Sequence, residues 1–364
     1  MANLKNNSKF KNLHLLSLAF EQAKINLGST KRNPSVGCIV EKDGAVISSA
    51  CTSFNGRPHA EFNALNKMKD FKNSNIYVTL EPCSHYGLTP PCTNIIVKKK
   101  IKKVFFSVYD PDKRSGKKAK NLFKKKKIFA RGSLLKKNGL NFYQSYYLQH
   151  SNNLPLIDAK IAISKDYFTK NIKKKWITNF YSQRRSHLLR SMYDCLISTA
   201  KSINDDNSLL DCRIEGLEKK SPDLIILDRT LRLKNKLKLF KKNKNRKILL
   251  FTCSNNKRKI LYLKKRGIKI FRINSLKSKN DFRRLFLILK NKGYSRIFVE
   301  SGLTFLNFLI KNKFLKNIYV FKSGNSLKKL GTNYSSSNII KKITLKNSIA
   351  VNLFGDKLYK ERLK

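Results

Sequence analysis

The segment TLEPCSHYGLTPPC, residues 79–92, decides how the first part of the chain is interpreted, because it sets Cys83 and Cys92 around a short turn. Earlier in the chain stands His59-Ala60-Glu61. One imidazole and two thiolates form a ligand set that zinc accepts while it keeps a fourth position for water. The sequence therefore predicts a zinc site made of His59, Cys83 and Cys92.

Glu61 is the predicted catalytic residue of this site. Zinc lowers the pKa of its bound water, and a carboxylate two residues after His59 can take that water's proton and pass it to a leaving amine. A lone histidine is usually an ordinary surface or core residue, and two cysteines are usually buried thiols. Here the histidine, the glutamate and the two cysteines occur together, and His59 and Cys92 each stand at a predicted helix start. A helix N-terminus favours the thiolate form of a cysteine. We therefore interpret them as one site for hydrolytic deamination.

The first 150 residues alternate short apolar runs with helical stretches, a pattern typical of a layered α/β domain. The predicted strands are 35–40, 45–49, 75–80, 103–108 and 127–130, and the predicted helices are 13–25, 59–69, 92–99 and 117–124. The polar segment QHSNNLP, residues 149–155, ends in proline. It predicts a boundary between a domain of residues 1–150 and a domain of residues 151–364.

The second part of the chain again alternates strands and helices. The predicted strands are 156–163, 195–198, 224–228, 247–252, 268–271 and 296–300, and the predicted helices are 183–191, 281–290 and 303–310. The lysine-rich stretch 234–247 is predicted to be a solvated connection. No G-x-G-x-x-G motif follows a strand. The turn Ser301-Gly302-Leu303-Thr304 can hold a phosphate on free backbone N–H groups, or it is an ordinary strand-to-helix turn.

The net charge of +57, from 79 basic and 22 acidic residues, raises the possibility of nucleic-acid binding. Lysines recur along the whole chain beside abundant Asn and Ile, and they do not gather in one tail or helical face. We therefore favour compositional drift of surface positions, and we expect no nucleic-acid partner. A basic surface still attracts phosphorylated substrates and dinucleotides at long range.

Nothing in the sequence indicates a membrane or secreted protein. No apolar run reaches the length of a membrane span, and residues 1–20 lack the apolar run and the small-residue cleavage site of a signal peptide. An odd number of cysteines, seven, argues against a disulfide framework. We expect a cytoplasmic protein.

The motif of residues 79–92, together with NPSVGC at 33–38, closely resembles the deaminase part of the bifunctional riboflavin-biosynthesis deaminase–reductases. Eight residues separate Cys83 from Cys92, whereas two separate the cysteines in many cytidine and tRNA adenosine deaminases. The resemblance implies a three-layer, cytidine-deaminase-like fold for this part and places Asn33 in the substrate pocket. Asp110-Pro111 also matches. Leu88 stands where the family usually carries a basic residue.

The second half resembles the reductase of the same family in several ordered blocks. These are KIAISKD at 160–166, WIT at 176–178, residues 184–190, residues 206–213 and VESG at 299–302. The resemblance implies a dihydrofolate-reductase-like α/β fold that binds NADPH. The residues implied to bind substrate are Lys174, Arg190, Leu210, Arg213 and Glu300, with the arginines at its phosphate. The residues implied to bind NADPH are Ala162, Trp176, Ser202, Asp206, Arg229, Gly302, Leu303, Thr304, Phe305, Leu306, Asn307 and Phe308.

Three departures from the reductase pattern stand out. Tyr167 replaces a glycine beside the nicotinamide region, and a tyrosine adopts a positive φ at higher cost than glycine does. Asn207-Ser208 replaces Asp-Pro, and Lys201 falls in a segment that is normally small and apolar.

The whole pattern predicts a bifunctional enzyme of riboflavin biosynthesis with one Zn²⁺ per chain and NADPH. Its expected substrate is a small pyrimidine ribose phosphate, 2,5-diamino-6-(ribosylamino)-4(3H)-pyrimidinone 5′-phosphate, and we expect a homo-oligomer. One alternative is a nucleic-acid or nucleotide deaminase with a basic accessory domain, which would act on a flipped or single-stranded base. Another alternative is a deaminase whose second half is a decayed reductase that serves as a scaffold.

Overall fold

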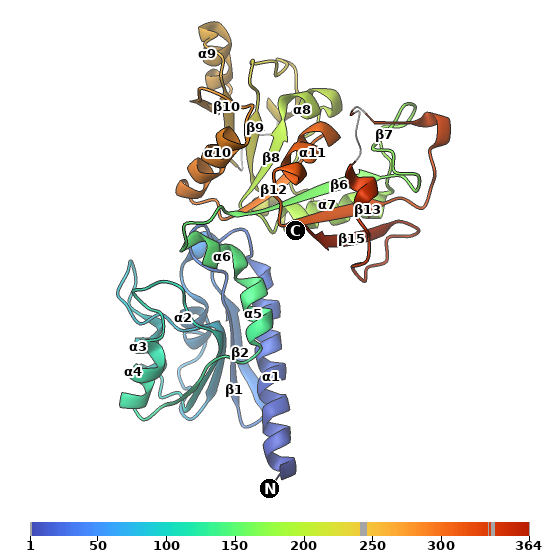
Figure 1. Cartoon of the computed structure of the whole chain (residues 1–364). Coiled ribbons are helices and arrows are strands. Elements are labelled where there is room, and N and C mark those ends of the chain that lie inside the picture. The colour runs from blue at the N-terminus through green and yellow to red at the C-terminus, as the bar shows by residue number, and fades with distance from the viewer. Residues whose placement is uncertain (1, 241–245, 334, 336–338, 364) are drawn as a thin grey trace. The chain divides into compact units, whose positions relative to one another are not determined.

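The computed structural model describes residues 2–240, 246–333, 335 and 339–363, with only the backbone described for residues 2–8. The chain divides into two compact units, Met1–Asn153 and Leu154–Lys364 (Figure 1). Each unit carries its own hydrophobic core and is described by itself. The division falls within the polar segment in which the sequence predicts a boundary.

The first unit is a five-stranded sheet in the order β2-β1-β3-β4-β5. β1 pairs antiparallel with β2 and β3, and β3, β4 and β5 run parallel. The strands are β1 (Gly37–Lys42), β2 (Ala45–Cys51), β3 (Asn75–Leu80), β4 (Lys103–Val108) and β5 (Phe129–Arg131). The helices are α1 (Ala2–Ile25), α2 (Ala60–Leu65), α3 (Cys92–Lys98), α4 (Ala119–Lys125), α5 (Lys136–Phe142) and α6 (Gln144–Gln149).

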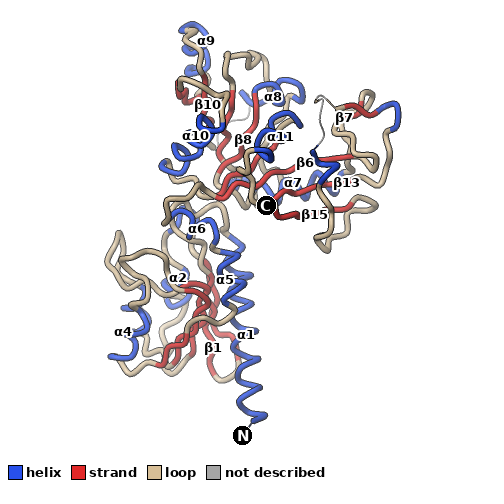
Figure 2. The backbone as a smooth tube through the Cα atoms, in the orientation of Figure 1, coloured by secondary structure: helices blue, strands red, loops and turns tan. Residues whose placement is uncertain are grey.

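This first unit has three layers, as the resemblance predicts. Helices α1 and α5 lie on one side of the sheet, and α2, α3 and α4 lie on the other (Figures 1 and 2). Small residues let α1 approach closely: a Cβ at Gly37 would lie only 1.8 Å from the Ala19 carbonyl oxygen. Ala19 and Ala23 are fully buried against the strand. The glycine of the NPSVGC motif is therefore needed for packing between α1 and β1.

The second unit is an eight-stranded sheet in the order β11-β10-β9-β8-β12-β6-β13-β15, with β15 antiparallel to the parallel strands beside it. The strands are β6 (Leu156–Ile163), β8 (Cys195–Thr199), β9 (Asp223–Leu227), β10 (Ile248–Thr252), β11 (Ile268–Arg272), β12 (Arg296–Glu300), β13 (Asn317–Lys322) and β15 (Lys357–Arg362). The helices are α7 (Phe180–Arg190), α8 (Ala200–Asp206), α9 (Lys257–Lys265), α10 (Lys279–Asn291) and α11 (Leu303–Lys311). A separate ribbon pairs β7 (Lys170–Asn171) with β14 (Gly331–Thr332).

Two hydrophobic cores flank this larger sheet. Alternate residues of a strand enter different cores: Ile197 of β8 packs with α10 and α11, whereas Leu196 packs with α7, α8 and α9. Sheets covered on both faces bind ligands at the carboxyl ends of their parallel strands. The second site is therefore expected at the strand ends Ile163, Thr199 and Glu300.

One prediction about this unit is wrong in part. The lysine-rich stretch 234–247 is not simply a solvated connection, because Leu237 and Leu239 are buried beside a short 3-10 helix, Lys238–Phe240. Residues 241–245 of that stretch lie outside the described residues. None of the seven cysteines, all of which lie in the described part of the chain, forms a disulfide. In the described part of the chain, no helix is long and apolar enough to cross a membrane.

Candidate active sites

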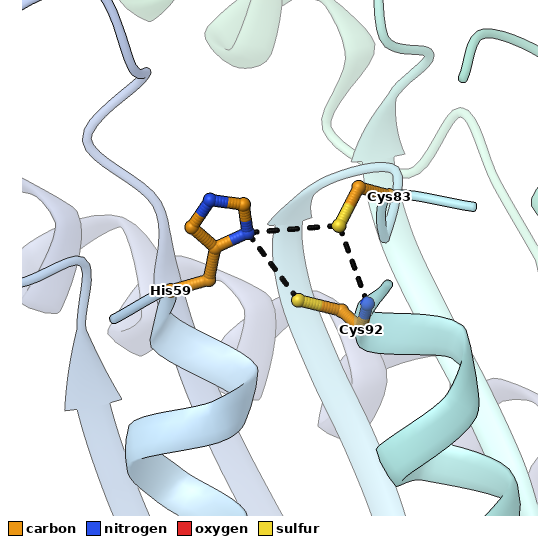
Figure 3. A group of neighbouring side chains, drawn as sticks. All are labelled: His59, Cys83 and Cys92. Carbon is orange, nitrogen blue, oxygen red and sulfur yellow. Dashed lines mark hydrogen bonds between the residues drawn. The ribbon is translucent and has the colours of Figure 1, made fainter. Parts of the chain in front are cut away.

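The three predicted zinc ligands come together in the first unit. His59 immediately precedes α2, Cys83 lies in the turn that follows β3, and Cys92 is the first residue of α3. The His59 Nδ1 atom lies 3.6 Å from the Cys83 sulfur and 3.4 Å from the Cys92 sulfur (Figure 3). The backbone N–H of Cys92 also donates to the Cys83 sulfur at 3.2 Å.

These separations match what a zinc ion requires. With Zn–N near 2.0–2.1 Å, Zn–S near 2.3 Å and tetrahedral angles, the nitrogen and each sulfur should lie about 3.6 Å apart. The observed 3.6 and 3.4 Å agree with that value. With zinc bound there, Nδ1 of His59 would be the ligand atom, because it is the ring nitrogen that lies near both sulfurs. One imidazole and two thiolates leave a fourth position for water.

The surroundings of Cys83 favour its thiolate form. The Cys92 thiol and then the His59 ring hydrogen-bond to the Cys83 sulfur, and together they lower the pKa of Cys83 well below its ordinary value. A thiolate is the form that binds metal. The hydrogen bond with Cys83, followed by burial, raises the pKa of Cys92, so this second thiol would lose its proton when a metal binds.

Glu61, the predicted proton carrier, lies in the first turn of α2 with only 3% of its surface exposed. Burial, followed by the charge of the Cys83 thiolate, raises the pKa of Glu61 to about 7. A carboxyl group whose pKa lies near neutrality can both accept and release a proton during a reaction. Glu61 borders the ligand set, because its carboxylate also interacts with the Cys92 thiol.

Glu81 has a structural task that the sequence does not reveal. Its carboxylate accepts the backbone N–H groups of Asp110 at 3.1 Å, Lys117 at 2.8 Å and Ala119 at 3.1 Å. These bonds fix the loop between β4 and α4, which contains the Asp110-Pro111 pair. Glu81 is thus an anchor for the loop next to Cys83, and it is not one of the grouped metal ligands.

We expect Glu81→Gln to destabilise the first unit by about 1–3 kcal/mol, because the new amide N–H groups face backbone donors that lose an acceptor. Zinc release during urea unfolding reports this unit. The chain has a single tryptophan, Trp176, in the second unit, so its fluorescence should be unchanged. Glu21→Gln on the exposed face of α1 is the matched control. Equal zinc-release curves for wild type and Glu81→Gln would contradict this role.

Asn33, which is predicted to lie in the substrate pocket, connects the loop around residues 29–33 with the turn at residues 55–56, just before His59. Its Nδ2 donates to the Gly56 carbonyl at 2.8 Å, and the Asn55 N–H donates to the Ser29 carbonyl at 2.8 Å. Gly56 has φ +90°, and a Cβ there would lie 2.5 Å from the Thr30 carbonyl oxygen. Asn33 therefore holds the turn that leads into His59.

In the second unit, Arg190 and Glu300 form a buried, two-pronged ion pair. The Arg190 Nε donates to Glu300 Oε1 at 2.6 Å and its Nη2 donates to Oε2 at 2.9 Å. The Arg190 Nη1 also donates to the Asp211 carbonyl at 3.0 Å. Burial alone would raise the pKa of Glu300, but the Arg190 guanidinium outweighs it and holds that pKa below its ordinary value. The structure thus gives both residues a protein partner; their contact with substrate stays a prediction.

Arg213 and Leu210, also predicted to bind substrate, flank the same ion pair. The half-exposed Arg213 lies 3.0 Å from the Asp211 carboxylate and 3.2 Å from the His187 Nε2 atom. Leu210 is buried with a left-handed backbone, φ +55°. Its carbonyl accepts Arg246 Nη1 at 2.6 Å.

Three further residues of this region are not predicted from the sequence as part of the site: Lys160, His187 and Arg246. Burial, the largest influence, lowers the pKa of Lys160, which lies near the Glu300 carboxylate. Burial, followed by the charge of Arg190, lowers the pKa of His187 to about 4, so this imidazole is neutral. The buried Arg246 holds the carbonyls of Leu209 and Leu210. The block KIAISKD at 160–166 contains the one signal that could have pointed to Lys160.

The turn predicted to bind NADPH brings several polar groups to the end of β12. The Gly302 N–H donates to the Ser202 Oγ at 3.0 Å, and the hydroxyls of Thr199 and Ser301 lie 3.0 and 3.4 Å from that oxygen. The next N–H groups of α11 belong to its first turn and cannot form bonds within the helix. Such a helix start, beside three hydroxyls, fits a phosphate group.

Within the predicted cofactor segment 302–308, most side chains serve the core. Leu303 and Leu306 are buried, and Phe305 and Phe308 pack against Phe282. Asn307 is also buried. Contact with a cofactor is therefore expected from the backbone of the first turn and from the Thr304 side chain.

The other predicted binding residues lie on different elements of the second unit. Ala162 is partly buried on β6, and Asp206 ends α8 with its pKa raised by burial. Lys174 and Trp176 are exposed in the segment after β7, with Trp176 55% exposed. Arg229 is exposed after β9, where its carbonyl accepts the Cys253 N–H at 3.1 Å. The structure leaves these assignments as predictions.

The departures from the reductase pattern are accommodated locally. Tyr167 keeps a left-handed backbone, φ +68°, at a cost of roughly 1–2 kcal/mol for a residue with a Cβ. Its ring lies 4.4 Å from the Lys322 ammonium. Asn207, with φ +45°, is a residue type that tolerates this conformation and ends α8. Lys201 is exposed and pairs with Asp205 at 3.0 Å, so its charged end points away from the core.

Comparisons with known proteins agree with this two-part organisation. Residues 11–108 match the family model of the cytidine and deoxycytidylate deaminase zinc-binding region, and residues 155–323 match the RibD C-terminal domain. The riboflavin biosynthesis protein RibD of Aquifex aeolicus is 28% identical over 309 residues, which cover 84% of this chain and 85% of that protein. RibD of Actinobacillus pleuropneumoniae is 29% identical over 301 residues, covering 81% and 79%.

Solved structures share the fold over almost the whole chain. RibD of Acinetobacter baumannii superposes with a TM-score of 0.81 at 23% identity, covering 97% of this chain and 99% of that one. A diaminohydroxyphosphoribosylaminopyrimidine deaminase/5-amino-6-(5-phosphoribosylamino)uracil reductase from Thermotoga maritima gives 0.80 at 24% identity, covering 98% and 100%. Both domain matches and the relatives that align with most of the chain indicate the same family. The chain belongs to the family of bifunctional riboflavin-biosynthesis deaminase–reductases.

Proposed function

We propose that the chain catalyses two consecutive steps on one pyrimidine ribose phosphate. The first unit hydrolyses the 2-amino group of 2,5-diamino-6-(ribosylamino)-4(3H)-pyrimidinone 5′-phosphate, so that water enters the ring carbon and ammonia leaves. The second unit then reduces the ribosyl group of the product, 5-amino-6-(5-phosphoribosylamino)uracil, to a ribityl group. The reduction consumes NADPH and one proton.

The deaminase half of the proposal is carried by one observation: His59, Cys83 and Cys92 stand at zinc-binding separations beside a buried Glu61. A bound zinc ion would supply an activated water at neutral pH. Glu61, with its pKa raised to about 7, accepts the water's proton and donates it to the departing amine. Asn33 and the turn it holds position the ring.

The reductase half is supported by the cluster at the carboxyl ends of β6, β8 and β12. NADPH would supply the hydride, and its phosphates fit the first turn of α11 beside Ser202. Glu300 ends β12 opposite Lys160 of β6 and binds Arg190 at the end of α7, and these residues would orient the ribosyl group. The arginines Arg190 and Arg213 remain our candidates for the substrate phosphate.

A direct assay tests the proposed function. The purified protein should release ammonia from the pyrimidine phosphate, and NADPH should be oxidised only after that deamination. Ammonia release from tRNA or single-stranded DNA, with none from the small substrate, would favour a nucleic-acid deaminase instead. Deamination without any NADPH oxidation would favour a decayed second unit. We further propose a homo-oligomeric, cytoplasmic enzyme without a nucleic-acid partner.

Removal of one metal ligand should separate the two activities. We expect Cys83→Ala to lose bound zinc and ammonia release, because two remaining ligands hold the ion far more weakly. The reduction of supplied 5-amino-6-(5-phosphoribosylamino)uracil should continue, since the reductase cluster belongs to the other compact unit. Metal analysis and both assays check this result. Cys253→Ala, a free thiol of the second unit, is the control; full zinc content in Cys83→Ala would refute the ligand assignment.

A further inference from the structure

The deaminase site is bordered by a loop without positive charge, although the proposed substrate carries a phosphate. The eight residues between Cys83 and Cys92, SHYGLTPP, contain no lysine or arginine. Leu88 at the tip of this loop is 90% exposed. Charge-assisted hydrogen bonds hold a phosphate dianion more strongly than neutral donors do. A cation that strengthens phosphate binding here has to come from another segment.

Arg57 is a cation that reaches this loop from the segment just before His59. Its Nη1 donates to the Thr89 Oγ1 at 2.5 Å. A Cβ built on Gly87 would lie 3.5 Å from the Arg57 Nη2 and 3.9 Å from the His85 Nε2. The guanidinium thus lies along the loop between Gly87 and Thr89, with the His85 ring beside it.

The neighbouring backbone fixes the position of Arg57 relative to the predicted ligand His59. On one side, the carbonyl of the preceding Gly56 accepts the Asn33 amide. On the other side, Pro58 connects it directly to the ligand His59. Because both neighbours are fixed, the Arg57 backbone has little freedom to move. The residue therefore stands between the predicted substrate-pocket asparagine and the metal ligand.

The Arg57 guanidinium has further N–H donors that can bind a phosphate group. Arginine has five N–H donors, and one of them bonds Thr89 in the described structure. Glu61 is buried, whereas Arg57 is half-buried and Thr89 is exposed. A pyrimidine that reaches Glu61 from solvent would leave its ribose phosphate nearer the surface. That is the side on which Arg57 and Thr89 lie.

We infer that Arg57 binds the 5′-phosphate of the pyrimidine substrate and makes the deaminase selective for the phosphorylated compound. This inference rests on the proposed deaminase function. Arg57 acts on the phosphate through charge-assisted hydrogen bonds and takes no part in proton transfer at the ring. The competing explanation is that Arg57 only braces the loop through Thr89.

The test compares the pyrimidine ribose phosphate with the corresponding nucleoside, which has a free 5′-hydroxyl. For Arg57→Met we expect KM for the phosphate to rise about 10- to 100-fold, the size of a lost hydrogen bond to a charged group, with kcat nearly unchanged. KM and kcat for the nucleoside should stay at the wild-type values. Arg57→Lys should recover part of the loss, because it restores the charge without the planar fork.

Two controls make the result specific. Arg131→Met removes the same side chain from the exposed edge strand β5 and should leave both substrates unaffected. Metal analysis of Arg57→Met should give one zinc per chain, which shows that the loop and ligand set are intact. Equal losses for phosphate and nucleoside in Arg57→Met would show a bracing role and overturn the inference. A wild-type protein that deaminates neither compound would overturn the proposed function itself, and the inference with it.

Discussion

Replacement of Glu61 by glutamine is expected to lower kcat for ammonia release by about 10²- to 10⁴-fold, the contribution of a positioned general acid–base group. An amide of nearly the same shape can neither accept the water's proton nor deliver it to the amine. Glu61 is buried in the first turn of α2, so the substitution removes no exposed charge. Single-turnover measurement of ammonia release gives the rate of the chemical step.

The zinc content and the second activity serve as internal controls for Glu61→Gln. The ligand set consists of His59, Cys83 and Cys92, so one zinc per chain should remain. Reduction of supplied 5-amino-6-(5-phosphoribosylamino)uracil should match the wild type, because the reductase cluster lies in the other unit. Ammonia release at the wild-type rate in a zinc-loaded Glu61→Gln protein would exclude the assigned role.

The second large effect concerns the Arg190–Glu300 pair. We expect Arg190→Met to destabilise the second unit by about 3–5 kcal/mol, because it leaves a buried carboxylate without its partner. NADPH oxidation should also be lost. Trp176 is the single tryptophan and belongs to this unit, so its fluorescence during urea unfolding measures the stability of the second unit. Arg283→Met on the exposed face of α10 is the matched control.

The double variant Arg190→Met/Glu300→Leu separates stability from binding. Two apolar side chains of similar volume remove the unpaired charge, so much of the lost stability should return while NADPH oxidation does not. If the double variant is as unstable as the sum of the single variants, the pair does not couple in the folded protein. Recovery of both stability and activity would exclude a role in substrate binding.

The same pair makes a pH dependence with a definite sign. Glu300 has a pKa below its ordinary value in the folded protein, whereas an unfolded glutamate titrates near pH 4.3. Its contribution to stability is therefore fully present above about pH 4.3 and is lost as pH falls through the lower native pKa. Because burial alone raises the pKa of Glu300, Arg190→Met should reverse this dependence, so that the Trp176 unfolding curves show stability falling as pH rises.

The sequence predicts best where chemistry or periodicity is local. Strands β3, β4, β6 and β12 have the predicted limits because each is a short, nearly continuous apolar run. The sequence also brings His59, Cys83 and Cys92 together correctly, because few functions other than metal binding explain that donor set. Helix α9, with the sequence KRKILYLKK, was missed because its lysines conceal the short apolar face. The antiparallel strand β15 was missed for a related reason, since charged residues alternate with its buried ones.

Long-range partnerships are what sequence reasoning could not supply. The sequence offers Arg190 as a phosphate ligand, but it cannot reveal that Glu300 takes two of its donors from a strand far along the chain. Arg57 looks like one more basic residue in a chain of net charge +57, and only the fold places it over Gly87 and Thr89. The choice of Nδ1 in His59 likewise needs coordinates.

The carboxylate of Glu81, which accepts three backbone N–H groups, also bears on the behaviour of the chain in acid. Asp194 and Asp228 hold backbone N–H groups of the second unit in the same manner. With only 22 acidic residues against 79 basic ones, each such carboxyl both anchors a turn and offsets the repulsion among the lysines. Protonation of carboxyl groups removes that offset and leaves the repulsion among the lysines uncompensated. The chain should therefore expand in mild acid sooner than a protein of balanced charge, and neutral, salt-containing buffers suit its handling.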